Sequence, residues 1–165
     1  MQNLALATQQ FTMTFTLLTA PLMPTIRTGG SVAGGVTDND GNGATLSTAP
    51  GSALYTALID GVVHQTLFAD PTMLTVVSPF DSADLVPPGA FGTPIPGLPA
   101  PGVATSIGIR YDFTLTGQDA ASFTGVFDVQ PTPEPGTAGL FGLGLGGLAL
   151  LGRRAPVGPA VRLEG

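Results

Sequence analysis

The chain has 165 residues, a formal net charge of −6 and only 10% charged residues, and all five of its cations are arginine. This length suits one domain with a hydrophobic core. So few cations cannot neutralise a run of phosphates, so no nucleic-acid partner is expected. Cysteine is absent and histidine occurs once, which excludes disulfides, cysteine-zinc sites, iron–sulfur clusters, thiol catalysis and a histidine-rich metal site. The composition favours a non-enzymatic surface or matrix protein.

An alternation of apolar residues with threonine and glutamine predicts a first strand within residues 4–18. The apolar positions that share one parity are Ala5, Ala7, Phe11, Met13, Phe15 and Leu17. This period of two is typical of a half-buried antiparallel strand. Next, short apolar segments at 32–36 and 44–48 flank the polar turn 38–43, which predicts a hairpin.

A second hairpin is predicted in the middle of the chain. Residues 53–60 and 62–68 are strand candidates that meet at the tight-turn dipeptide Asp60-Gly61. Residues 72–78 predict one more strand. The segment 86–102 then holds six prolines and four glycines, which predicts a surface loop with polyproline character and no central strand.

The clearest alternation lies at residues 105–116, where Tyr111 and Phe113 share the apolar parity. After the turn at 117–119, residues 121–129 return with their own apolar parity, which predicts a hairpin with an aromatic inner face. Together these segments predict an all-β body, an antiparallel β-sandwich of two sheets over residues 1–130.

An uncharged run of 17 residues, 136–152, follows a proline-rich break and precedes the pair Arg153 and Arg154. As a helix the run would be about 26 Å long, close to the thickness of the hydrocarbon core of a bilayer. The arginine pair at its end predicts a transmembrane helix whose C-terminal side is cytoplasmic. A buried core helix or a glycine-rich strand is the alternative. Residues 155–165 form a short tail.

The segment 133–154, PEPGTAGLFGLGLGGLALLGRR, resembles the PEP-CTERM sorting signal, in which a Pro-Glu-Pro motif precedes a hydrophobic helix and an arginine-rich end. The resemblance implies recognition through Pro133, Glu134 and Pro135 by exosortase, a membrane transpeptidase-like enzyme of Gram-negative bacteria. It also implies transient anchoring in the inner membrane, removal of the helix, and delivery to the cell envelope or extracellular matrix.

Two features depart from the usual pattern of such proteins. No signal peptide precedes the first strand, so we expect that the gene model begins too late. The tail after Arg154 is also longer than usual, which an extended or frameshifted terminus would explain.

The segment Asp38-x-Asp40-x-Asn42-Gly43 matches the first six positions of a calcium-binding loop, with oxygen ligands at positions 1, 3 and 5 and a glycine for the turn. Position 12, which should be a bidentate glutamate, is Ala49. The two interpretations are a β-type calcium site that recruits another oxygen and a polar turn in which these residues supply positive φ.

Nothing in the sequence pairs the remaining acidic residues for catalysis. The single histidine, His64, lies in a strand candidate, and no Gly-x-Ser-x-Gly motif is present. The sequence therefore predicts an exported, non-catalytic protein of the cell surface or biofilm matrix that needs no cofactor, with calcium bound only if the Asp38 loop is a metal site. Extracellular polysaccharide is an expected partner. The alternatives are a carbohydrate-binding or calcium-dependent binding module and, more distantly, a secreted hydrolase.

Overall fold

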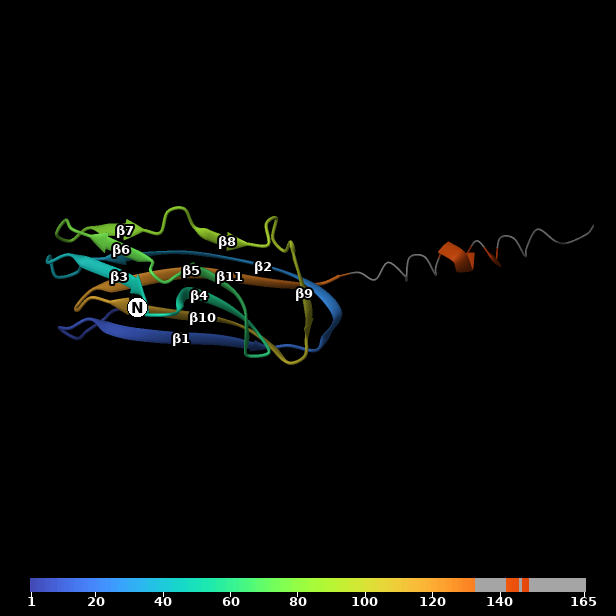
Figure 1. The fold of residues 1–165 in the computed structure, drawn as a ribbon. Helices are drawn as coiled ribbons and strands as arrows, with labels where there is room; N and C mark the ends of the chain where they lie inside the picture. The colour runs from blue at the N-terminus through green and yellow to red at the C-terminus, as the bar shows by residue number, and fades with distance from the viewer. Residues whose placement is uncertain (133–141, 146, 149–165) are drawn as a thin grey trace, which may run out of the picture. The chain divides into compact units, whose positions relative to one another are not determined.

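The structure is a computed structural model that describes residues 1–132, 142–145 and 147–148. Contacts divide the chain into two units, Met1–Thr132 and Pro133–Gly165. The first unit, called the body below, consists of eleven strands among its described residues (Figure 1). They are β1 (Gln9–Leu18), β2 (Leu22–Thr37), β3 (Ala44–Thr48), β4 (Ala53–Ile59), β5 (Val62–Ala69), β6 (Met73–Val76), β7 (Ser82–Asp84), β8 (Gly89–Phe91), β9 (Leu98–Val103), β10 (Ser106–Leu115) and β11 (Ala120–Pro131).

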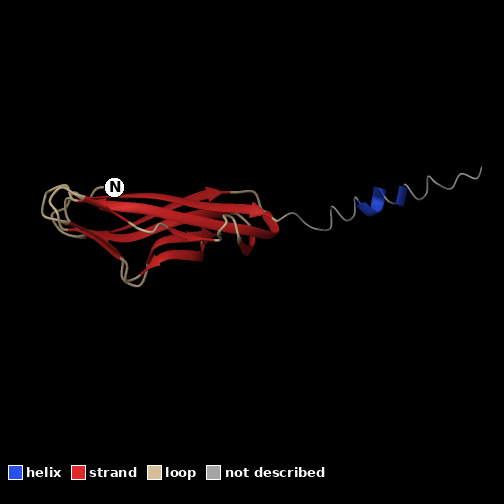
Figure 2. Cartoon of the chain, turned by 90° about the horizontal axis from the view of Figure 1, so that it is seen from above, coloured by secondary structure: helices blue, strands red, loops and turns tan. Residues whose placement is uncertain are grey.

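The strands form two antiparallel sheets that pack face to face (Figure 2). Sheet I has β10 at its centre. Strand β1 pairs with one side of β10, and β4 and β3 pair with the other side and carry β5 and β6 outside them. Sheet II has β2 at its centre, with β11 on one side and β7, β8 and β9 in succession on the other. The predicted antiparallel all-β body is confirmed.

Two of the predicted hairpins are wrong. Strands β2 and β3, and likewise β10 and β11, are consecutive in sequence but belong to opposite sheets, so segments 38–43 and 116–119 are arches from one sheet to the other. The alternation of apolar residues shows which side of a strand is buried. This pattern is the same when the next strand pairs with the first in one sheet and when it lies in the opposite sheet. The β4–β5 hairpin is confirmed, with positive φ at Asp60 and Gly61.

The segment 86–102 is also not the loop that its composition predicted. It contributes β8 and most of β9, which pair with β2 at the edge of sheet II. Pro99 and Pro101 lie two residues apart in β9, so their nitrogens point to the same side of the strand. An edge strand needs N–H groups only on its paired side, which is why prolines are tolerated there.

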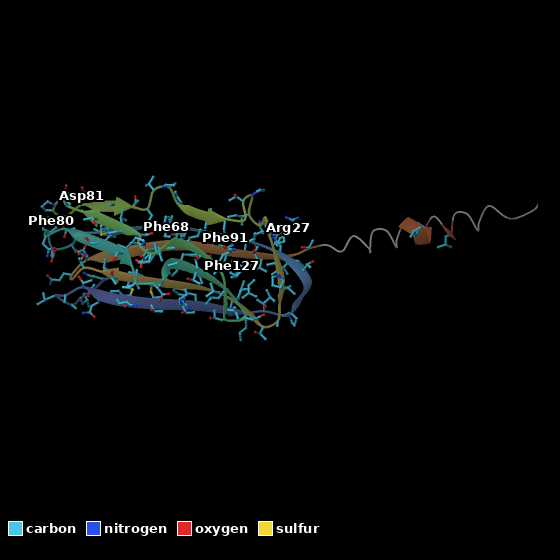
Figure 3. The ribbon with its side chains drawn as sticks, viewed as in Figure 1. Arg27, Phe68, Phe80, Asp81, Phe91 and Phe127 are labelled. Atoms are coloured by element: carbon cyan, nitrogen blue, oxygen red, sulfur yellow. The ribbon has the colours of Figure 1, made fainter. Side chains whose placement is uncertain are left out.

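Aromatic side chains fill the interior between the sheets. Phe113, which is fully buried, stacks on Phe11 at 5.4 Å within sheet I and meets Phe123 of sheet II at 5.0 Å. Phe123 also stacks on Tyr111 at 5.2 Å. The aromatic inner face predicted for β10 and β11 is therefore present, although it is formed between two sheets. Figure 3 shows Phe91 and Phe127 in the same interior, 6.2 Å apart.

The predicted C-terminal hydrophobic helix falls mainly on residues outside those described. Residues 142–145 and 147–148 are helical. Within the described part of the chain, no helix has the length and apolar character required to span a membrane.

Gly125 on β11 provides a test of the interior packing. A Cβ atom at this position would overlap the hydroxyl group of Tyr111, so Gly125→Ala should lower the free energy of unfolding by about 1–3 kcal/mol. Thr124→Ala, on the exposed face of the same strand, is the control and should change it by about 0.5 kcal/mol or less. Urea denaturation measures both free-energy changes, and equal effects would contradict the contact between Gly125 and Tyr111.

Candidate functional site

The predicted calcium loop is the arch between β2 and β3. Asp38 is buried there, and its carboxylate accepts four backbone N–H groups. Oδ1 accepts from Asp40 at 3.2 Å and Gly41 at 2.9 Å. Oδ2 accepts from Gly43 at 3.1 Å and Phe80 at 3.0 Å. Burial raises the pKa of Asp38, but the hydrogen bonds outweigh it and hold that pKa below its usual value.

The second arch brings another carboxylate to the same place. Asp119, which is fully buried, accepts a hydrogen bond from the backbone of Asn39 at 3.3 Å and a short one from the hydroxyl of Thr116. Carboxylate oxygens of Asp38, Asp40 and Asp119 lie within 4.8 Å of one another. Asp119 was not predicted as a member of this group, because only the folded chain brings the two arches together.

The other residues of the predicted loop contribute less. Asn42 donates from its side-chain amide to Oδ2 of Asp40 at 2.6 Å and from its backbone to Oδ1 at 3.2 Å, so it acts as a hydrogen-bond donor. Ala49, at the position where a calcium loop has its bidentate glutamate, is buried beyond β3. The third carboxylate of the group therefore comes from the other arch.

This donor set suits a hard cation on chemical grounds. Calcium is bound by carboxylate and carbonyl oxygens, and three carboxylates in one place supply both the oxygens and the negative charge. However, all four backbone hydrogen bonds of Asp38 already engage its two oxygens. The same geometry thus also serves as a cap that orders the arch without an ion.

Asp60 is a cap of the same kind at another turn. Its carboxylate accepts backbone hydrogen bonds from Ala104 at 2.8 Å, Thr105 at 2.7 Å and Ser106 at 2.9 Å, and one from the Thr105 hydroxyl at 3.0 Å. The backbone hydrogen bonds lower the pKa of Asp60 from 3.8 to about 2. The contact joins the β4–β5 turn to the segment before β10.

His64 is packed between the sheets. Its Nε2 lies 2.9 Å from the hydroxyl of Thr28, and its ring faces those of Phe91 and Phe127 with centroids 6.4 and 6.2 Å away. Burial lowers the pKa of His64 and so favours its neutral form. These neighbours are those of a structural histidine.

The residues that carry the sorting resemblance lie outside the described part of the chain. They are Pro133, Glu134, Pro135, Arg153 and Arg154. The segment begins at the end of the body, where Thr132 still donates a backbone hydrogen bond to Thr25 at 3.1 Å.

The order along the chain, an all-β body followed by the segment that resembles a sorting signal, is typical of a protein with a C-terminal sorting signal. Residues 131–155 match the family model of the PEP-CTERM protein-sorting motif, so the chain carries this motif, as the resemblance predicted. The motif indicates an exported protein that exosortase recognises and processes, with delivery to the cell envelope. Neither the comparison with curated proteins nor that with solved structures gave a match.

Stability at low pH tests the Asp60 cap. The pKa of Asp60 is lower in the folded state than in the unfolded state. The stabilisation that its carboxylate gives to the fold is therefore complete above the unfolded-state pKa of 3.8 and is lost as the pH falls through about 2. Asp60→Asn should therefore be less stable than the wild type at pH 6, and this difference should shrink between pH 4 and pH 2. Thermal unfolding across this range measures it, and a difference independent of pH would contradict the cap.

Proposed function

We propose that this protein is an exported, non-catalytic component of the cell surface or the extracellular polysaccharide matrix, such as that of a biofilm. The observation that carries the proposal is the order of parts along the chain: a compact body ends at Thr132, and the sorting motif matches from 131 to 155. With this order, the C-terminal segment directs export and can be removed, and the body is the part that is delivered.

The role proposed for the C-terminal segment follows from its composition. The run 136–152 contains no charged residue, so as a helix it would enter the hydrocarbon core, and Arg153 and Arg154 would stay on the cytoplasmic side. Pro133, Glu134 and Pro135 would then lie on the outer side, where exosortase recognises them. Anchoring is transient, because processing removes the helix.

A structural role for the body is supported by the way its reactive side chains are used. The carboxylates of Asp38 and Asp60 cap turns, and His64 contacts Thr28 and two phenylalanine rings. Threonine side chains cover the outer face of β1, with Thr12, Thr14 and Thr16 exposed. Their hydroxyls suit hydrogen bonding to extracellular polysaccharide.

A calcium-dependent binding module is the second candidate, and Asp119 is the observation that favours it. The loop pattern lacked a further acidic ligand in the sequence, and the fold supplies one within 4.8 Å of Asp38 and Asp40. Calcium bound there would join the two arches and order the end of the body that they form.

The sorting proposal is tested by cell fractionation. The gene is expressed from its own locus with an epitope tag at the exposed Val77, in cells with and without exosortase. We expect an exported product that lacks the 136–152 segment only when exosortase is present. Glu134→Gln should reduce this processing, whereas Asp128→Asn, a matched loss of charge in β11, should not. A full-length product retained in the membrane of both strains would contradict the proposal.

Calcium binding is tested by thermal unfolding in 10 mM calcium. An affinity between about 10⁻⁴ and 10⁻³ M, typical of extracellular modules, would stabilise the protein by about 1.4–2.7 kcal/mol. Asp119→Asn should remove this gain, and Asp128→Asn should keep it. The absence of any calcium-dependent shift in the wild type, or an equal shift in Asp119→Asn, would leave the turn cap as the only role of the cluster.

A further inference from the structure

Strand β1 forms an edge of sheet I and extends beyond sheet II. Among the described strands, it pairs with β10 alone, from Gln9 to Leu18. Strand β10 in turn packs across the interior against β11, as the contacts of Phe123 with Tyr111 and Phe113 show. Because β11 is itself an edge of sheet II, no described strand of that sheet covers the inner face of β1.

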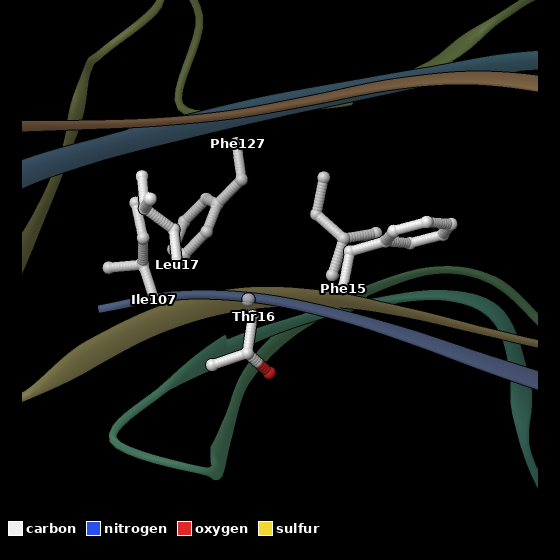
Figure 4. Close-up of a pocket in the computed structure, with 7 residues that line it drawn as sticks. Phe15, Thr16, Leu17, Ile107 and Phe127 are labelled. Carbon is white, nitrogen blue, oxygen red and sulfur yellow. The ribbon is translucent and has the colours of Figure 1, made fainter.

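The uncovered part of β1 is apolar. Phe15 and Leu17 are 60% and 62% exposed although they have the parity of the interior. They line an open groove of about 250 Å³ together with Ile107, Ile109 and Phe127. Figure 4 shows Phe15, Leu17 and Ile107 on the side that faces Phe127, and Thr16 on the opposite side.

β1 lacks the features that usually protect an edge strand from pairing. Its sequence, QQFTMTFTLL, contains no charged residue, proline or glycine, and its pairing with β10 has no bulge. Two of the other edges are interrupted, and the third, β11, contains Gly125 and the charged Asp128. Prolines occur throughout the row of β7 to β9, and Asp70-Pro71 separates β5 from β6.

The backbone groups that β1 leaves unpaired follow from its register. Thr19, which continues β1, donates from its backbone to the oxygen of Thr105 at 2.9 Å, and this pair continues the β1–β10 register. Odd-numbered residues therefore point their N–H and C=O groups toward β10. The even-numbered residues point theirs away from the sheet, and these are Gln10, Thr12, Thr14, Thr16 and Leu18.

We propose that β1 is the interface of a homodimer, in which the β1 strands of two copies pair antiparallel about a two-fold axis at Thr14. This register brings all five outward-pointing residues of each strand into hydrogen-bonding positions. A register centred one residue away on either side, at Met13 or Phe15, brings in only four. Sheet I of one copy then continues into sheet I of the other.

The side chains of β1 are self-complementary in this register. On the outer face Thr12 lies opposite Thr16 of the second copy, and such threonine pairs stabilise sheets. On the inner face Phe11 lies opposite Leu17, and Met13 lies opposite Phe15. The apolar side chains of the inner face in one copy thus contact their counterparts in the other, and no like charges meet because β1 contains no charged residue.

Cysteine crosslinking tests the geometry, because the full chain has no native cysteine. In the dimer, Thr14→Cys places two thiols on directly opposite residues. Thr12→Cys and Thr16→Cys place them about 14 Å apart, four residues along the strand. A short bis-thiol reagent should therefore link Thr14→Cys most efficiently. Thr124→Cys on β11 is the control, and crosslinking there equal to that at position 14 would overturn the proposal.

The mass of the full chain in detergent tests the interaction independently. Thr14→Lys places two ammonium groups opposite each other and should convert a dimer into a monomer. Thr124→Lys adds the same charge to an exposed position of β11 and should leave the dimer intact. A wild-type monomer, or a dimer that persists in Thr14→Lys because another segment of the chain associates, would overturn the assignment of β1.

Discussion

The packing of β10 against β11 is the contact on which the rest of the body depends. The two strands follow each other in sequence but lie in different sheets. Because they share no backbone hydrogen bonds of a sheet, their side chains must hold them together. Phe123 contacts both Tyr111 and Phe113, and each such aromatic pair adds about 0.5–1.5 kcal/mol to the effect of burial. Tyr55 adds a hydrogen bond between the sheets, from its hydroxyl to the oxygen of Val126 at 2.8 Å.

Acidic residues order the turns that this packing requires. An arch must reverse the chain without the hydrogen bonds of a hairpin, and its backbone N–H groups need other acceptors. Asp38 meets this need with four hydrogen bonds in the first arch, and Asp119 binds both arches together through Asn39 and Thr116. Asp38 and Asp119 thus have a structural role that follows from the geometry of the connections they order.

The sequence predicted the local features well and the long-range ones poorly. Period-two alternation located β1 and β10, and Asp60-Gly61 located the β4–β5 turn, because strands and tight turns depend on neighbouring residues. The same patterns could not distinguish a hairpin from an arch. For this reason the approach of Asp119 to Asp38 was missed, although Asp38 itself stood out by its spacing. The prolines of β9 concealed a strand because only their position at an edge makes them compatible with pairing.

Negative charge in the body is concentrated outside the strands, whereas strand β1 carries none. Of the nine aspartates in the chain, six lie outside the strands. The outer face of β1 instead carries threonine, and the neighbouring Arg110 and Asp112 of β10 form an ion pair of 2.7 Å. Negative charges at the turns of two copies would repel each other if those ends met. Contact between copies along β1, which carries no charged residue, meets no such repulsion from the residues of the strand itself.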